Sequence, residues 1–123
     1  MKLSENMLNF LGYTYETCED GIDFIEAGFA VGLAYPLGIK SALDNGLIVQ
    51  ASHTLKFPEK GEPILPGCPY GRTFSGYRLT PLGVEIGRYG NLMRSKAKTQ
   101  DQRSGYVKAA QYVLDARQRS AAS

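Results

Sequence analysis

Apolar positions at helical spacing predict three helices in the N-terminal part of the chain, at residues 4–11, 20–34 and 36–45. Gly12 is suited to end the first helix. A break is expected at Tyr35, because the residue before a proline disfavours the helical conformation. Pro36 is suited to a first helical position, and Gly46 is suited to the left-handed turn that ends a helix.

Aromatic, β-branched and alternating apolar positions predict three strands, at residues 13–17, 47–57 and 74–80. The two longer strands are expected to pair as a hairpin. Between them, residues 58–71 contain four prolines and three glycines, which exclude both a helix and a strand ladder. A loop of this length inside a compact domain is usually functional or mobile.

The segment Tyr77-Arg78-Leu79-Thr80-Pro81-Leu82-Gly83 predicts a strand that turns into a helix. Thr80 is a strong N-cap residue, and Pro81 then occupies the first helical position. The amphipathic pattern continues to about residue 94. Residues 95–103 are polar and predict a linker, after which Ser104 caps a last helix that extends to residue 119.

Glycines that share a face of a predicted helix indicate close packing. Gly83, Gly87 and Gly90 share one face of the helix that starts at Pro81. Because glycine destabilises a helix interior by up to about 1 kcal/mol relative to alanine, another element is expected to pack very close to this face. That element is either the last helix of the same chain or a second copy. Gly28 and Gly32 predict a similar close approach to the second helix.

The chain has 123 residues, which is enough for one domain with one core. We expect a domain over residues 1–94, a C-terminal linker and helix over residues 95–119, and a disordered tail over residues 120–123. No window approaches the roughly 18 apolar residues of a membrane span, and no signal-peptide pattern occurs, so we expect a cytoplasmic protein. Cys18 and Cys68 form no framework pattern and are expected to be reduced thiols.

The charge distribution is uneven, although the net charge is only +2. Residues 1–35 contain one lysine and six acidic residues, whereas most of the basic excess follows Gly87. This distribution permits nucleic-acid binding without requiring it. The single histidine, His53, has no ligand partner at short spacing, and the sequence contains no phosphate loop or nucleophile elbow. We therefore expect no metal, no cofactor and no enzymatic activity.

Two short pieces of the chain resemble winged helix-turn-helix domains. Leu43-Asp44-Asn45-Gly46-Leu47-Ile48 resembles the end of a recognition helix that enters the first wing strand. Residues 77–83 resemble the second wing strand and the following helix in bacterial repressors of the multiple-antibiotic-resistance and phenolic-acid-responsive types. The resemblance covers about residues 4–94. It implies an α+β fold with three N-terminal helices, a two- to three-stranded sheet with a long wing hairpin, and one or two C-terminal helices.

Proteins of this bacterial and phage type are mostly dimeric transcription regulators that bind double-stranded DNA. The resemblance implies that residues 36–45 enter the major groove and that the hairpin over residues 47–80 is the wing. Base edges are expected to be read by Lys40 and Ser41, with Tyr35 nearby. Phosphates are expected to be contacted by Lys56, Arg72 and Arg78. The helix over residues 106–119 is the expected homodimer interface.

A second hypothesis is a protein-binding winged-helix module, such as a phage or mobile-element inhibitor or adaptor. The predicted recognition helix has one lysine offset by one aspartate, which is a weak charge for a DNA-reading surface. Ile64 and Leu65 are apolar residues on a loop without regular structure, so they must pack on the domain or on a partner. Under this hypothesis Ile64, Leu65 and Tyr70 contact a protein.

Overall fold

The computed structural model describes residues 1–19 and 24–122, and it describes the backbone alone at residues 18, 19, 121 and 122. The described residues form four helices and a three-stranded antiparallel sheet. The elements are α1 Glu5–Glu19, β1 Ile25–Glu26, α2 Ala27–Asp44, β2 Ile48–Thr54, β3 Thr73–Leu79, α3 Pro81–Lys96 and α4 Gln100–Ala122. The expected α+β class is confirmed, and the layout is compatible with a winged-helix arrangement.

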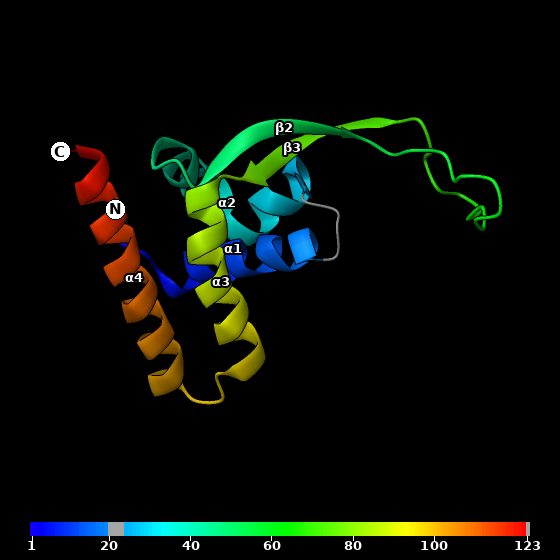
Figure 1. Cartoon of the computed structure of the whole chain (residues 1–123). Helices are drawn as coiled ribbons and strands as arrows, with labels where there is room; N and C mark the ends of the chain where they lie inside the picture. Colours follow the sequence, from blue (N-terminus) through cyan, green and yellow to red (C-terminus); the bar gives the residue numbers. More distant parts are fainter. Residues whose placement is uncertain (20–23, 123) are drawn as a thin grey trace.

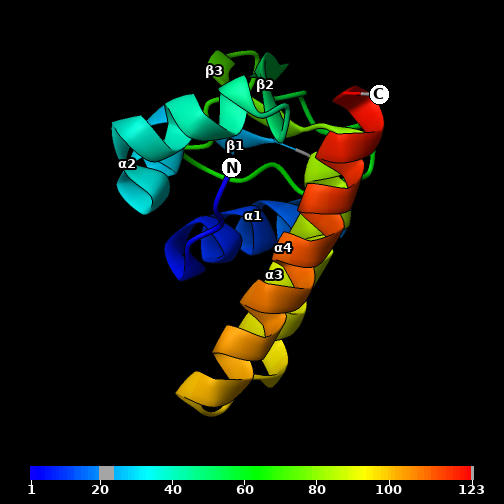
Figure 2. The same cartoon turned by 90° about the vertical axis from the view of Figure 1, so that its left-hand side faces the viewer.

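The helices form a body from which the β2–β3 hairpin projects (Figure 1). Helices α3 and α4 run antiparallel and side by side, and α1 lies between this pair and α2 (Figure 2). Leu8, Phe10 and Leu11 of α1 are fully buried, as are Ile86 of α3 and Leu114 of α4. The core therefore lies where these three helices meet, and buried residues of α2 and of the base of the hairpin extend it.

The sheet has the strand order β1-β3-β2, so β3 is its central strand. Ile48 pairs with Leu79 where the hairpin leaves the body, and Thr54 pairs with Thr73 at its far end. The hairpin predicted from residues 47–57 and 74–80 is therefore confirmed, although β2 is shorter than predicted and β3 begins and ends one residue earlier. Beyond Thr54 the chain forms the long loop without regular structure that the prolines predict.

The first helix is longer than the sequence predicts. Helix α1 continues past Gly12 and includes residues 13–17, so the predicted helix end and the predicted short strand are both wrong. A Cβ atom at Gly12 would overlap the backbone of Gly90 in α3, so this glycine allows two helices to cross closely. Thr14 is fully buried, and its hydroxyl donates a hydrogen bond of 3.0 Å to the Phe10 carbonyl.

The second predicted helix begins later than expected. Ile25–Glu26 forms the edge strand β1, and α2 starts at Ala27. Residues 20–23, including the predicted cap Asp20, lie outside the described residues. Glu26 is the observed cap, because its carboxylate accepts a hydrogen bond of 3.1 Å from the Phe29 N–H. The close approach predicted at Gly28 and Gly32 is wrong, since neither glycine faces another backbone segment.

The predicted break at Tyr35 is confirmed, and it divides α2 into two helical parts. Tyr35 has a φ of 61° and a ψ of 161°, which is outside the helical region, and Pro36 follows it. The second part ends at Asp44, and Gly46 adopts the predicted left-handed conformation with a φ of 70°. The two helices predicted before and after Tyr35 are therefore the two parts of α2, so the described residues form fewer helices than predicted.

Helix α3 begins as predicted at the junction of residues 77–83. The Thr80 hydroxyl accepts a hydrogen bond of 3.0 Å from the Gly83 N–H and donates one to the Gly46 carbonyl. Thr80 therefore caps α3 and also joins it to the turn that follows α2.

The connection after α3 is shorter than predicted. Helix α3 extends to Lys96, and α4 already begins at Gln100. The Thr99 hydroxyl accepts a hydrogen bond of 3.2 Å from the Gln102 N–H. The predicted cap at Ser104 is therefore wrong, since this residue lies inside α4. The helix continues to Ala122, into the segment predicted as a tail.

The glycines of α3 contact α1 and the start of the hairpin. A Cβ atom at Gly90 would overlap the backbone carbonyl of Leu8, and one at Gly87 would crowd that of Leu11. A Cβ atom at Gly83 would overlap the Leu47 carbonyl. The close packing predicted from these glycines is confirmed. Both partners considered from the sequence, the last helix and a second copy, are wrong.

None of the helices over residues 1–19 and 24–122 has the length and apolar composition that a membrane crossing needs.

Candidate functional site

The second part of α2 presents an exposed surface, which we call the outer face of α2 and define as Tyr35, Pro36, Leu37, Lys40 and Asp44. Ile39 and Ala42 lie on the opposite side and are buried. The outer face is unusually apolar, because Leu37 is 82% exposed and Tyr35 is 66% exposed. Ser41 is half-buried at its margin. The structure therefore brings the predicted base-reading residues Tyr35, Lys40 and Ser41 onto one short helical segment.

The only charged residue between Ala27 and Leu43 is Lys40. Its ammonium group lies 3.2 Å from a carboxylate oxygen of Asp44, one turn further along the helix. Both side chains are well exposed, and a surface pair at this spacing contributes only about 0.3–0.5 kcal/mol. A phosphate can therefore replace Asp44 as the partner of Lys40 at little energetic expense.

The backbone at Tyr35 is strained. Among the described residues other than glycine, Tyr35 alone has a positive φ. A residue with a side chain in this region of conformational space raises the energy of the fold by about 1–3 kcal/mol. Burial of the ring does not offset this strain, because the side chain is mostly exposed. Strain of this kind is concentrated at functional sites.

The long loop of the hairpin, residues 58–71, has some internal order. The Gly71 N–H donates a hydrogen bond of 2.7 Å to the Leu55 carbonyl, which extends the ladder beyond β2 and β3. The Tyr70 hydroxyl accepts one of 3.0 Å from the Leu65 N–H. Ile64 is nevertheless 75% exposed and Leu65 is 60% exposed, so these side chains do not pack on the domain.

Three rings lie in a row on the sheet with an arginine at each end, in the order Arg72, Phe74, His53, Phe24 and Arg78. The guanidinium carbons of Arg72 and Arg78 lie 5.2 Å and 5.7 Å from the ring centroids of Phe74 and Phe24. Phe24 stacks on His53 at 5.4 Å, and His53 pairs in register with Phe74. Two of the predicted phosphate-contacting residues therefore lie against rings, and His53 is a strand residue, as predicted.

The sequence did not predict that Phe24 belongs to this row of side chains. Phe24 directly precedes β1, and β1 lies beside the central strand β3 through the pair Ile25 and Tyr77. Only that pairing brings Phe24 to Arg78. Lys56 and Arg72 lie near the start and end of the long loop and are exposed, so they remain available to a ligand.

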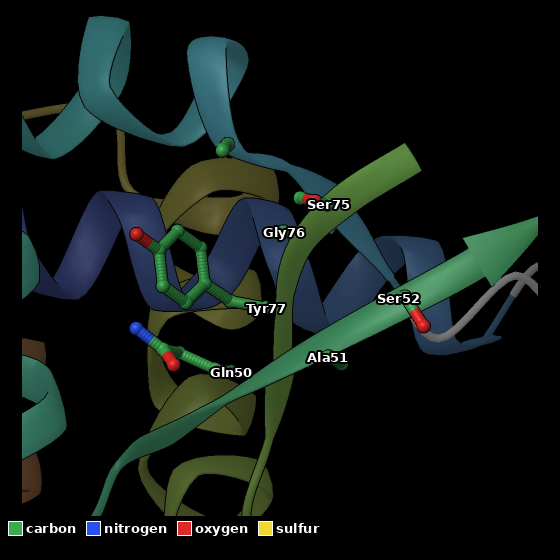
Figure 3. Close-up of a pocket in the computed structure, with 7 residues that line it drawn as sticks. Gln50, Ala51, Ser52, Ser75, Gly76 and Tyr77 are labelled. Carbon is green, nitrogen blue, oxygen red and sulfur yellow. The ribbon is translucent and has the colours of Figure 1, made fainter. Parts of the chain in front are cut away.

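The sheet also carries a shallow hollow of about 510 Å³ (Figure 3). Its lining residues are Ala27, Gln50, Ala51, Ser52, Ser75, Gly76 and Tyr77. The side chains of Gln50 and Tyr77 lie on the same side of the strands, where the two residues pair in register. The lining supplies hydroxyl and amide groups but no carboxylate, imidazole or thiol. It can form hydrogen bonds and provides no general base.

The C-terminal helix buries Ala110 and Leu114 against its own chain. On its outer side Tyr112 is 74% exposed. An apolar hollow of about 330 Å³ lies between α3 and α4, lined by Tyr89, Leu92, Gln102, Gly105, Tyr106 and Ala109. The helix predicted as a homodimer interface therefore carries one exposed large apolar residue, Tyr112, and an apolar hollow beside it.

Two ion pairs fasten α4 to the other helices. A guanidinium nitrogen of Arg117 lies 2.9 Å from a carboxylate oxygen of Glu85, and one of Arg103 lies 3.3 Å from Glu5. The hydrogen bonds from Arg117 lower the pKa of Glu85 and raise the pKa of Arg117. Hydrogen bonds from Gln100 and then Arg103 lower the pKa of Glu5. These two arginines therefore serve the fold.

No group of three His, Cys, Asp or Glu side chains within the described part of the chain is arranged to hold a metal ion. Cys68 is a free thiol, as predicted, while the side chain of Cys18 lies outside the described residues. No protein-family model, curated protein or solved structure matches the chain.

Proposed function

We propose that the chain is a winged helix-turn-helix protein that binds double-stranded DNA and regulates transcription. The observation that carries this proposal is the division of α2 at Tyr35. It produces a short helix with one buried side and one exposed side, and this helix leads through Gly46 into the projecting hairpin. Winged-helix domains of this layout place such a helix in the major groove and the hairpin against the backbone.

The chemistry of these surfaces fits moderate electrostatic binding. Lys40 on the outer face of α2 can contact base edges or a phosphate. Lys56, Arg72 and Arg78 on the hairpin supply three further cations. If each of the four cations neutralises one phosphate, the logarithm of the affinity falls with the logarithm of salt concentration with a slope of about −3.6.

The salt slope of charge variants tests this proposal. Lys40→Ala and Lys56→Ala should each weaken binding to mixed genomic DNA fragments and reduce the slope by about one. Lys108→Ala, an exposed lysine on α4, is the matched control and should leave the slope unchanged. Equal slopes for all three variants and the wild type would contradict the assignment of these lysines to phosphate contacts.

A second candidate function is protein binding through the long loop, and the exposure of Ile64 and Leu65 favours it. Leu65→Asp should leave the unfolding free energy within about 0.5 kcal/mol of the wild type, because the side chain makes no core contact. The variant should also fail to retain proteins that the immobilised wild type retains from a cell extract. Retention of the same proteins by both forms would count against this function.

The regulator is proposed to act as a homodimer through α4, since Tyr112 is exposed on this helix and an apolar hollow lies between α3 and α4. Light scattering of the purified chain measures this directly. A mass of one chain at all concentrations would exclude the dimer.

A further inference from the structure

Strand β2 forms one edge of the sheet, because the order β1-β3-β2 leaves its outer side without a neighbouring strand among the described residues. The hairpin projects from the helical body, so this edge lies along the projecting part (Figure 1). We call residues 50–56 the free edge of β2. The side chains of Gln50, Ser52 and Thr54 are exposed along it.

The hydrogen bonds of the hairpin show which backbone groups the free edge presents. The Leu47 carbonyl and the Leu55 N–H both form hydrogen bonds of 3.0 Å to the opposite side of the hairpin. Residues along an antiparallel ladder alternate between those that bond to the partner strand and those that face away from it. The N–H and C=O groups that point outward are therefore those of Gln50, Ser52 and Thr54.

These outward groups lack the usual protection of an edge strand. Natural edge strands are often short or carry lysines or prolines, yet β2 has seven residues, and residues 47–55 contain no lysine, arginine, carboxylate or proline. The Ser52 carbonyl accepts a hydrogen bond of 3.2 Å from Arg78, and a carbonyl can accept a second one. Within the described part of the chain, nothing accepts a hydrogen bond from the outward N–H groups. Another extended polypeptide matches this row of donors and acceptors.

The charge around the free edge restricts the composition of that polypeptide. Residues 46–58 and 71–80 contain Lys56, Arg72 and Arg78 and no aspartate or glutamate. Lys56 and Arg72 are exposed near the outer end of the edge. The loop beyond contains one lysine and two glutamates, so the hairpin as a whole remains positive. An acidic segment complements this charge, whereas a second copy would bring two positive hairpins together.

The shallow hollow on the sheet offers a place for one side chain of such a segment. Residues that pair across neighbouring strands place their side chains on the same face. The residue opposite Gln50 would therefore extend its side chain on the side where Gln50 and Tyr77 line the hollow (Figure 3). The hydroxyl and amide groups of this lining can form hydrogen bonds with a polar side chain.

We propose that the free edge of β2 binds an extended acidic segment of a partner protein, which joins the sheet as an additional strand. Backbone hydrogen bonds to residues 50–54 hold the segment, and Lys56 and Arg72 select its charge. This interaction does not depend on the proposed DNA binding.

The test begins with peptides selected on the immobilised full chain. Random peptides of about ten residues are long enough to span the edge at about 3.3 Å per residue. The retained peptides should contain more aspartate and glutamate than lysine and arginine.

Methylation of single backbone nitrogens in a selected peptide distinguishes strand addition from other modes of binding. Every second methylated position should lower the affinity about tenfold, the factor that corresponds to one lost hydrogen bond. The positions between them should tolerate the methyl group, because their N–H groups face away from β2.

Variants of the chain locate the binding at the free edge. Ser52→Pro removes an outward N–H and leaves the ladder to β3 intact, and an edge strand tolerates proline at such a position. It should lower the affinity for the selected peptide about tenfold, while thermal unfolding verifies that the variant is folded. Ser52→Ala keeps the N–H and should lower the affinity less than about twofold. Lys56→Ala should lower it about threefold, as expected for one exposed ion pair.

Several results would overturn the inference while leaving the DNA titration unaffected. Retained peptides without an acidic excess would contradict the role of Lys56 and Arg72. A uniform response to methylation, or equal binding by folded Ser52→Pro and Ser52→Ala, would contradict strand addition. Failure to retain any peptide would also overturn it, and a wild-type dimer that Ser52→Pro converts to monomers would assign the edge to a second copy instead.

Discussion

Both the contact between α1 and α3 and the outer face of α2 contain residues that are unfavourable at their positions. Packing within the fold explains those at the helix contact but not those on the outer face. Gly12, Gly87 and Gly90 are unfavourable inside helices, yet each allows a backbone approach that a side chain would prevent. Tyr35 is unfavourable because its φ is positive, and Leu37 is unfavourable because its apolar side chain is exposed. No contact within the described part of the chain explains these two. The glycines therefore serve the fold, whereas the exposed apolar residues belong to the surface for which DNA binding is proposed.

The largest expected effect is at the helix contact. Gly90→Ala should destabilise the protein by about 3 kcal/mol, because its Cβ would overlap the Leu8 carbonyl and the Gly12 backbone, which cannot move independently. Chemical denaturation measures this change. Gly105→Ala in α4 is the control, since a Cβ there meets nothing within 4 Å.

The control should change stability in the opposite direction. Alanine is a better helix former than glycine, so Gly105→Ala should stabilise the protein by about 0.5–1 kcal/mol. If Gly90→Ala were equally well tolerated, the close contact between α1 and α3 would be incorrect.

An intermediate effect is expected at Tyr35, where stability and binding should separate. Tyr35→Gly removes the strain of the positive φ and should raise the free energy of unfolding by about 1 kcal/mol, after the entropy of the added glycine is included. The same change removes an exposed ring from the outer face of α2 and should weaken DNA binding. Thermal unfolding and a DNA titration of the one variant measure both. A loss of stability would show that the ring contributes more to the fold than the strain removes.

The smallest expected effect concerns the ion pairs of α4. Glu5 and Glu85 have folded-state pKa values below their ordinary values, so the unfolded state binds more protons in this range. Their contribution to stability is present above about pH 4.3 and is lost as the pH falls through the folded-state values. Glu85→Gln should reduce this pH dependence of unfolding. An unchanged pH profile in that variant would show that the pair with Arg117 contributes nothing.

The sequence predicts those parts of the fold that local chemistry determines. The cap at Thr80, the helix start at Pro81, the break at Tyr35 and the left-handed Gly46 each depend on residues within a few positions. Residues 13–17 have strand-forming side chains but are helical, because Thr14 is buried in the core that α1 helps to form. That outcome depends on distant residues and has no local signal.

The same distinction applies to the candidate site. Leu37, Lys40 and Asp44 reach one exposed surface because helical spacing alone places them there, and Tyr35 joins them at the break that Pro36 predicts. The row of side chains from Arg72 to Arg78 depends on Phe24, which reaches the sheet only through the two-residue strand β1. A strand of two residues is formed by its pairing with Tyr77 and Gly76, so the sequence carries no pattern that predicts it.

A titration of the purified wild-type protein against mixed genomic DNA fragments at about 50 and 200 mM salt tests the central claim most directly. A protein that binds DNA with four phosphate contacts should lose about two orders of magnitude in affinity between these conditions. No binding at the lower salt concentration would contradict the account and would leave the exposed loop residues Ile64 and Leu65 as the basis for a protein-binding function.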